Sequence, residues 1–313
     1  MTRKKVLLTG LGSIGSRYKR LLLEMGGVEL FALRSGLKPP CEGVKELRSW
    51  AEVRKAAPDV AFITNPTFMH IETAIKCASL GMHLFIEKPL DMRLAGLKRL
   101  RSILSAGRLS SYVAYNLRLH PGILRLREIV SKEGFRHASV RCSSWLPDWR
   151  PGTDHKLSYS SSSGMGGGAV LDLSHDADYA GYIFGKISDI EGRAGRCSDV
   201  TRDAEDVADM LLLLEKGKHV SLHVDFCSRI PERAIKVTTP RASYELDLLR
   251  GRLAVSRGGR ISTTECGVDR DFTYKAEVRY FFKRLGGRMM NDVDEAAGLL
   301  RKLIAFKRRN GLI

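Results

Sequence analysis

Short apolar runs alternate with amphipathic segments over the first 118 residues. The apolar runs predict buried strands at residues 6–9, 28–33, 60–64, 84–86 and 111–115. Apolar residues at helical spacing predict helices at residues 16–24, 50–57, 68–80 and 91–104, the last with Asp91 as its N-cap. Strands and helices in this alternation predict a parallel sheet that is wound on both faces. We therefore expect residues 1–118 to form a doubly wound α/β domain.

The pattern changes after Pro121. Residues 123–130, 166–184, 274–285 and 293–309 have helical spacing, whereas strand-like runs cover 138–142, 207–214, 219–226, 234–238, 243–248 and 253–256. Successive short strands with short turns predict a largely antiparallel sheet. We therefore expect residues 119–313 to form an α+β domain with an open sheet, and the C-terminal helix to pack back on the first domain.

A glycine turn follows the first strand. Gly10, Gly12 and Gly15, with Ser13 and Ile14 between them, form a G-x-G-x-x-G pattern that leads into a helix. The glycines permit a tight turn, close approach of a pyrophosphate, and close packing of helix on strand. The helix N-terminus offers free N–H groups and a favourable dipole to phosphates. The sequence therefore predicts a Rossmann domain that binds a dinucleotide.

The end of the second strand bears on which dinucleotide binds. An NAD-specific site has an acidic residue there to accept from the ribose 2′-hydroxyl. This sequence has Arg34 and Ser35 at that point and no acid. Because an arginine there accommodates a 2′-phosphate, we expect NADP(H) to be preferred over NAD(H).

Two further segments follow the third and fourth strands. Asn65, Pro66 and His70 come after the third strand, and Glu87 with Lys88 after the fourth. Ligands of open parallel sheets bind beyond the carboxyl ends of the strands, so we expect these residues to contact the cofactor. Position alone leaves open whether Lys88 contacts a ligand or is an ordinary surface lysine.

These motifs, together with Gly166-Gly167-Gly168 and the later Asp172 and His175, resemble the glucose-fructose oxidoreductase, inositol dehydrogenase and MocA family. The resemblance implies a Rossmann domain followed by an open-faced sheet domain. It implies a nicotinamide-dependent oxidoreductase acting on sugars or cyclitols, with Lys88 and His175 catalytic and a cis peptide before Pro89. The Asp172–His175 interval of three resembles a branch associated with surface-polysaccharide sugar genes.

The chemistry of these residues fits such a reaction. Oxidation of a secondary alcohol removes a proton from oxygen and a hydride from carbon. Histidine suits the proton transfer, and a lysine ammonium stabilises the developing alkoxide. Asp172 precedes His175 by three residues, so on one helix they share a face and Asp172 orients the imidazole or contacts substrate. Asp176 and Asp178 are alternatives to Asp172 in this role. Two structural interpretations also stay open: Asp172 serves only to complement a helix dipole, and His175 is a core residue.

Substrate-binding candidates lie in two segments. Asn116 and Arg118 follow the fifth strand, and Trp145, Trp149 and Arg150 lie in a long irregular loop. Tryptophan faces pack on sugar rings, and arginine holds hydroxyls or anionic groups. The alternative is an ordinary apolar loop anchor. We expect the four serines from residue 160 to 163 to form a solvated turn.

Charge and cysteine content exclude other classes. The net charge is +17, but the basic residues are dispersed, so we interpret the excess as a solvated surface and do not expect nucleic-acid binding. No apolar run is long enough to span a membrane, and six scattered cysteines fit reduced thiols in the cytoplasm. No metal-ligand spacing is present. An open sheet face predicts a homo-oligomer, either a dimer or a tetramer.

The sequence leaves two other functions open. One is an imine, dihydrodiol or biliverdin-type reductase on the same fold, and the other is a regulator that binds NADP without turnover. The leading hypothesis is an oxidoreductase that transfers hydride between nicotinamide and a secondary alcohol or ketone of a sugar or nucleotide sugar, in surface-glycan biosynthesis.

Overall fold

The computed structural model describes residues 3–34 and 40–313. They fall into two compact units, the first Met1–Ala114 with Tyr274–Leu300 and the second Tyr115–Thr273 with Arg301–Ile313. Helix α9 (Val293–Arg309) begins in the first unit and ends in the second. The domain boundary at residue 118 and the packing of the C-terminal helix stay predictions, and each unit is described by itself.

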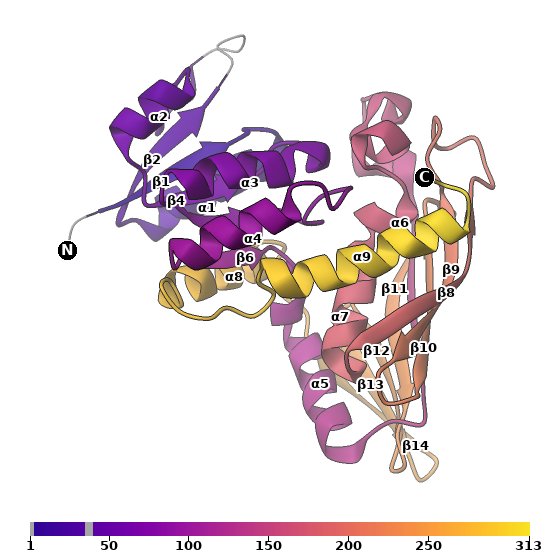
Figure 1. Ribbon diagram of the computed structural model, residues 1–313. Coiled ribbons are helices and arrows are strands. Elements are labelled where there is room, and N and C mark those ends of the chain that lie inside the picture. Colours follow the sequence, from indigo (N-terminus) through magenta and orange to yellow (C-terminus); the bar gives the residue numbers. More distant parts are fainter. Residues whose placement is uncertain (1–2, 35–39) are drawn as a thin grey trace. The chain divides into compact units, whose positions relative to one another are not determined.

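The first unit contains a six-stranded parallel sheet in the order β3-β2-β1-β4-β5-β6 (Figure 1). Its strands are β1 (Lys4–Thr9), β2 (Val28–Leu33), β3 (Lys45–Leu47), β4 (Val60–Ile63), β5 (His83–Ile86) and β6 (Ser111–Val113). The five predicted strands are confirmed. The short strand β3 escaped prediction because Leu47 is its one buried residue.

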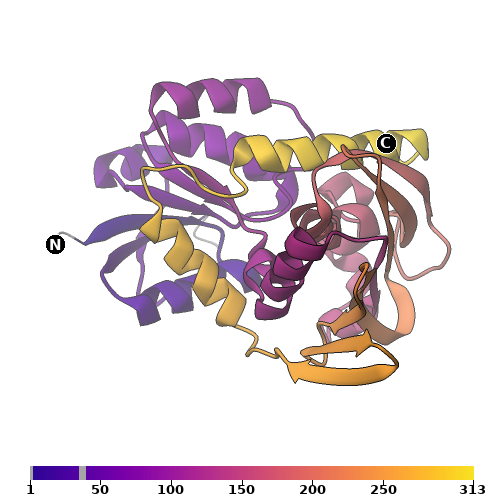
Figure 2. The same cartoon turned by 90° about the horizontal axis from the view of Figure 1, so that it is seen from below.

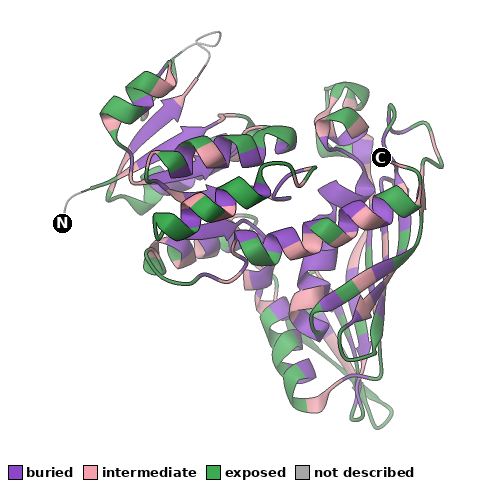
Figure 3. Ribbon diagram, in the orientation of Figure 1, coloured by how far each residue is buried: buried purple, intermediate pink, exposed green. Residues whose placement is uncertain are grey.

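Helices cover both faces of this sheet, as the doubly wound pattern predicted. They are α1 (Ser13–Met25), α2 (Trp50–Ala56), α3 (His70–Ser79), α4 (Leu97–Ala106) and α8 (Phe272–Lys283). Helices α1 and α8 lie on one face, with α3 and α4 on the other (Figure 2). Between the sheet and the first pair, Phe62 and Phe85 stack with ring centroids 4.3 Å apart, and Phe281 meets both edge-on. The central strands are buried on both faces (Figure 3).

The predicted role of Asp91 as N-cap of a helix over residues 91–104 is wrong. Helix α4 begins only at Leu97. The Asp91 carboxylate instead accepts from the backbone N–H groups of Met92 and Arg93, and from that of Ile71 at the start of α3, 3.0 Å away. Asp91 therefore closes a turn and caps the neighbouring helix, a contact that spans 20 residues.

The second unit contains an eight-stranded sheet in the order β14-β13-β12-β11-β7-β10-β9-β8, antiparallel except for the β7–β10 pair. Its strands are β7 (His137–Trp145), β8 (Ile187–Gly195), β9 (Val207–Leu214), β10 (His219–Asp225), β11 (Cys227–Thr238), β12 (Ser243–Asp247), β13 (Arg252–Arg257) and β14 (Arg260–Glu265). The predicted open, mainly antiparallel sheet is confirmed. Strands β8 and β14 escaped prediction, because only Ile187 and Ile190 of β8 are buried and all six residues of β14 are exposed.

Three helices lie against one face of this sheet, α5 (Pro121–Glu133), α6 (Ala169–Asp172) and α7 (Ser174–Phe184) (Figure 1). Short 3₁₀ turns occupy Thr67–Met69, Asn116–Leu119, Leu146–Trp149, His155–Leu157, Tyr159–Ser161 and Ser163–Met165. Within the described ranges, no helix has the length and apolar character that crossing a bilayer requires.

Candidate functional site

The glycine turn after β1 leaves no room for side chains at two of its three glycines. Gly10 has φ +120°, and a Cβ there would lie 2.8 Å from the carbonyl oxygen of Thr64. A Cβ on Gly15 would lie 2.0 Å from the carbonyl oxygen of Gly10. Gly12, by contrast, faces open space, which leaves its backbone accessible to a ligand. The Thr64 hydroxyl donates to the Gly10 carbonyl at 2.7 Å and fixes the turn against β4.

Helix α1 begins directly after this turn and has free N–H groups at its start. Its N-cap is Gly12, no side chain caps it, and its first turn contains no acidic residue. Since the first backbone bond of this helix runs from Ser16 N–H to the Gly12 carbonyl, the N–H groups of Ser13 and Ile14 precede it. This helix terminus therefore fits a pyrophosphate.

The turn after β4 is joined to the turn after β5 by His70. The buried imidazole places Nδ1 2.9 Å from the Pro89 carbonyl oxygen and Nε2 2.9 Å from that of Asn65. Burial lowers the pKa of His70. The Asn65 amide nitrogen donates to Thr73, whereas Oδ1 of Asn65 is buried without a hydrogen-bond partner in the described chain. This acceptor fits a donor group of a bound cofactor, and the neighbouring Pro66 is exposed.

The Glu-Lys-Pro segment directly follows β5. The Lys88–Pro89 peptide bond is cis. Glu87 is buried and Lys88 is half-buried. Oε2 of the Glu87 carboxylate accepts from the Lys88 backbone N–H at 3.0 Å, so the carboxylate braces the peptide that carries Lys88.

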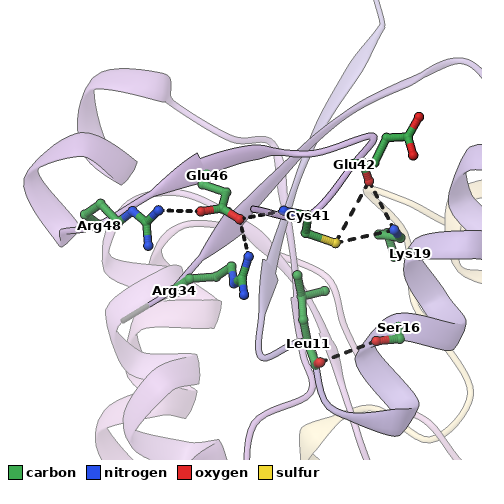
Figure 4. A network of polar contacts seen from close by, with 8 residues as sticks. All are labelled: Leu11, Ser16, Lys19, Arg34, Cys41, Glu42, Glu46 and Arg48. Carbon is green, nitrogen blue, oxygen red and sulfur yellow. Dashed lines mark hydrogen bonds and ion pairs between the residues drawn. The ribbon is translucent and has the colours of Figure 1, made fainter. Parts of the chain in front are cut away.

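Arg34, at the end of β2, contacts an acidic residue that the sequence analysis missed. Its guanidinium pairs with Glu46 on the neighbouring strand β3 (Figure 4). Glu46 also accepts from the Cys41 backbone N–H at 2.9 Å and from Arg48 at 2.6 Å. Glu46 lies on β3 and not at the tip of β2, and nothing in the sequence pairs β3 with β2. Ser35, the other predicted contact here, lies outside the described residues.

In the second unit, the predicted continuous helix over residues 166–184 is interrupted. Helix α6 ends at Asp172 and α7 begins at Ser174, with Leu173 between them at φ −91° and ψ 20°. Asp172 and His175 therefore lie on two successive helices and not on one continuous helix.

Asp172 is buried and held by two hydroxyl groups. Tyr159 donates to Oδ1 at 2.7 Å, and Ser160 donates to Oδ2 at 2.6 Å. Burial raises the pKa of the Tyr159 phenol well above its usual value, and the Asp172 charge adds to this. Because both of its carboxylate oxygens accept hydrogen bonds, Asp172 orients the hydroxyls of Tyr159 and Ser160.

The glycines before α6 make this arrangement possible. A Cβ on Gly167 would lie 2.1 Å from the Tyr159 carbonyl oxygen, and Gly168 has φ +102°. The loop residues therefore pack directly on the glycine backbone. The expectation of a solvated serine turn is wrong for Ser160, Ser161 and Ser162, all of which are buried. The Ser161 and Ser162 hydroxyls both accept from Arg202.

His175 lies in the first turn of α7 and is half-buried. Its ring packs edge-on against Tyr115, with centroids 5.4 Å apart. The Tyr115 hydroxyl donates to the hydroxyl of Ser174 at 3.1 Å. The imidazole is thus oriented by an aromatic neighbour that is itself fixed to the same helix.

The two aspartates of α7, Asp176 and Asp178, are bound by arginines. Arg118 contacts both oxygens of Asp178 at 2.6 and 2.8 Å, and all of these groups are buried. Arg233 contacts Asp176 at 2.6 and 3.1 Å. A paired, buried carboxylate of this kind holds a helix in place. Asn116, a predicted substrate contact, donates to the Thr273 hydroxyl at 2.7 Å and is also buried.

The irregular loop exposes its predicted substrate residues to different degrees. Trp145 is half-buried under the Arg229 guanidinium, 4.1 Å from its ring centroid. Trp149 is 40% exposed and meets Phe226 edge-on. Arg150 is exposed and lies 5.9 Å from the Tyr159 ring, which connects this part of the loop to Asp172. No cluster of three or more candidate metal ligands occurs in the described chain.

A glycine turn at the first helix of a doubly wound parallel sheet defines the class of NAD-binding Rossmann proteins. Residues 4–113 match the model of an oxidoreductase family with an NAD-binding Rossmann fold, and residues 134–245 match the GFO/IDH/MocA C-terminal domain. The two models together match well over half of the chain. The chain belongs to the Gfo/Idh/MocA oxidoreductase family.

Solved structures share the fold over nearly the whole chain. A levoglucosan dehydrogenase in complex with NADH has a TM-score of 0.86 and 17% identity, covering 98% of this chain and 97% of that one. A UDP-N-acetylglucosamine 3-dehydrogenase from Acidithiobacillus ferrooxidans has a TM-score of 0.81 and 18% identity, covering 99% and 98%.

Curated relatives match over shorter stretches. A 2,7-anhydro-N-acetylneuraminate hydratase from Escherichia coli is 20% identical over 64% of this chain and 55% of its own length. A myo-inositol 2-dehydrogenase from Thermotoga maritima is 27% identical over 58% of this chain and 55% of its own length. The chain thus spans about half the length of these relatives.

Proposed function

We propose that the protein is an NAD(P)-dependent oxidoreductase that transfers hydride between nicotinamide and a secondary alcohol or ketone of a sugar or nucleotide sugar, with a role in surface-glycan biosynthesis. One observation carries the proposal. The glycine turn of α1 and the Glu-Lys-Pro segment both follow parallel strands at the carboxyl edge of one sheet, where such folds bind dinucleotides. The similarity to sugar-acting dehydrogenases supports the substrate class.

The cofactor, when bound, supplies the hydride acceptor or donor, and the protein supplies position and charge. The start of α1 would hold the pyrophosphate through the N–H groups of Ser13 and Ile14. The buried, unpartnered Oδ1 of Asn65 would accept from the nicotinamide half, and His70 would keep the two turns together.

Lys88 and His175 take the two parts of the chemistry that fall to the protein. The Lys88 ammonium stabilises the alkoxide that develops on the substrate oxygen, or polarises the ketone in the reverse direction. His175 accepts or returns the hydroxyl proton. Asp172 acts on the substrate through Tyr159 and Ser160, which it orients.

Of the predicted substrate contacts, Trp149 and Arg150 are the best placed, since both are exposed on the loop. Trp145 supports that loop from its half-buried position. Arg118 and Asn116 take a positioning role instead of contacting substrate, because both are buried and bound to Asp178 and Thr273.

The test of this function is a turnover assay that follows absorbance of the reduced cofactor. NAD⁺ and NADP⁺ are each combined with levoglucosan, myo-inositol and UDP-N-acetylglucosamine, and NADH and NADPH with a panel of ketosugars. We expect cofactor-dependent turnover of at least one sugar. Reduction of cyclic imines without turnover of any sugar would favour an imine reductase, and tight cofactor binding without turnover would favour a regulator.

We further propose that NADP(H) is preferred, with Arg34 as the ligand of the 2′-phosphate. Arg34→Ala is then expected to weaken NADPH binding about tenfold, the scale of one charge-assisted hydrogen bond, and to leave NADH binding nearly unchanged. Because Glu46 competes for the same guanidinium, Glu46→Gln is expected to tighten NADPH binding. Fluorescence titration of both cofactors measures these affinities.

Arg48 provides the matched control for this prediction, since it contacts the same Glu46 but is 45% exposed. Arg48→Ala is expected to change neither affinity by more than about twofold, as for most exposed ion pairs. Equal loss of NADH and NADPH affinity in Arg34→Ala would contradict the preference, as would tighter binding of NADH than NADPH by the wild type.

We also propose a cytoplasmic homo-oligomer, a dimer or a tetramer, without a nucleic-acid partner. The six cysteines are free thiols, which fits a reducing compartment. Helices α5, α6 and α7 cover one face of the eight-stranded sheet, and the opposite face offers a surface for a second copy. Light scattering of the purified protein tests the oligomer.

A further inference from the structure

Three polar side chains meet in the aromatic core of the first unit. Glu87 comes from the turn after β5, Tyr18 from α1 and Glu277 from α8, and they are 8%, 0% and 0% exposed. The Tyr18 hydroxyl oxygen lies 2.8 Å from Oε1 of Glu87 and 2.6 Å from Oε1 of Glu277. Both distances are those of O–H···O hydrogen bonds.

These two contacts need more protons than the tyrosine can supply. A phenol has one hydrogen and can donate it to one of the two carboxyl groups. The other contact is a hydrogen bond only if that carboxyl is itself protonated and donates to the phenol oxygen. Two ionised carboxylates would set lone pairs against the same oxygen in a buried, apolar place, which is costly. The geometry therefore requires one neutral carboxyl among Glu87 and Glu277.

The surroundings decide which carboxyl is neutral. Glu87 accepts from the Lys88 backbone N–H at 3.0 Å, and the charges of Lys88 and Arg17 favour its ionised form. The second oxygen of Glu277 lies 3.4 Å from the Tyr112 hydroxyl. Burial raises the pKa of Glu277 well above its usual value, and the charge of Glu87 raises it further. Burial also raises the pKa of Glu87, but there the two cations and its hydrogen bonds oppose the rise.

We propose that Glu277 is a neutral acid at physiological pH, that it donates its proton to Tyr18, and that Tyr18 donates in turn to an anionic Glu87. Glu87 then keeps a full charge to receive the Lys88 backbone N–H. Glu277 is thus a positioning residue, which joins α8 and the helix of the glycine turn to the Glu-Lys-Pro segment. The consequence of this positioning for catalysis rests on the proposed function, whereas the protonation of Glu277 does not depend on it.

A neutral Glu277 makes the stability of the protein depend on pH. A carboxyl whose pKa is higher in the folded than in the unfolded state contributes stability that is fully present below the unfolded pKa and is lost as pH rises through the folded pKa. The titratable groups that face Glu277 are Glu87, Tyr18 and Tyr112. Burial raises the pKa of the Tyr18 phenol well above its usual value, so the contribution of this cluster to the change between acid and alkaline pH comes from its two carboxyls.

Glutamine distinguishes the two carboxyls, because its amide can donate where a neutral acid donates but carries no charge. We expect Glu277→Gln to match the wild-type Tm at about pH 5 and to exceed it by about 2 °C or more at about pH 9. Glu87→Gln is expected to lower Tm at both pH values, since it removes the anion beside Lys88 and Arg17. Glu72→Gln, an exposed change on α3, is the control and should leave the profile unchanged.

Infrared spectroscopy observes the proton directly. The wild-type protein is expected to show absorption of a buried carboxylic acid at neutral pH, and Glu277→Gln is expected to remove it whereas Glu72→Gln retains it. Absence of that absorption from the wild type overturns the proposal without any variant having to fold. Its retention in Glu277→Gln, or equal destabilisation by the two buried substitutions at every pH, overturns it as well. None of these measurements depends on the substrate.

Discussion

Replacing Lys88 with methionine is expected to lower kcat by about 10²–10³-fold, the scale for removing one preorganised group that stabilises developing negative charge. Methionine resembles the apolar stem of lysine but lacks the terminal ammonium and its charge. The Glu87 carboxylate braces the backbone at this point by accepting from the Lys88 N–H, so the turn itself is expected to persist. The measurement is steady-state turnover of the sugar identified by the assay above, together with NADH and NADPH titration.

Lys76 supplies the matched control for this substitution. It is an exposed lysine on α3 of the same unit, paired with Glu72, and Lys76→Met should leave kcat within about twofold. The prediction separates chemistry from binding, because cofactor affinity should fall by less than about threefold in Lys88→Met. Unchanged kcat in this variant would remove Lys88 from the reaction, whereas a loss confined to cofactor affinity would make it a binding residue alone.

The first unit was the more predictable from sequence because its signals are local. A buried strand is a short apolar run, and the glycine turn joins strand to helix within a few residues. Steric limits at Gly10 and Gly15 act between neighbours in the chain or across one pair of strands. A sequence pattern predicts a structure correctly where the residues of that one segment determine its conformation.

Several of the contacts that escaped prediction are long-range. Asp91 caps a helix 20 residues away. Glu46 reaches Arg34 through the pairing of β2 with β3, and the hydrogen bond between Tyr18 and Glu277 joins residues 259 positions apart. A charged residue's position in the sequence gives its chemistry, but its partner is determined by how sheets and helices pack.

In the second unit, one motif combines a local feature that was predicted with contacts to distant residues that were not. The sequence predicted that Gly166-Gly167-Gly168 opens a helix, and α6 follows it. The glycines also let the serine loop pack on the backbone, so that Ser160 and Tyr159 bind Asp172. Serines favour turns on average, but here their hydroxyls are paired inside the unit, and a composition rule cannot show that.

His175→Ala is the second substitution with a large expected effect. Without an imidazole to accept or return the hydroxyl proton, kcat is expected to fall by about 10²–10⁴-fold, the usual contribution of a general acid or base. NADH affinity should be preserved, because His175 lies on α7 of the second unit and the dinucleotide residues belong to the first. Turnover is measured with the same sugar as for Lys88→Met.

His137 offers the control, as an exposed histidine at the start of β7, and His137→Ala should keep kcat within about twofold. A second variant isolates the orientation of the imidazole. Tyr115→Phe retains the ring that packs on His175 but removes the hydroxyl that bonds to Ser174, so kcat should fall by far less than in His175→Ala. If His175→Ala retains full turnover while Lys88→Met loses it, the proton must move through another group. The hydroxyls of Tyr159 and Ser160 would then be the candidates, because Asp172 at the end of α6 holds both of them in place.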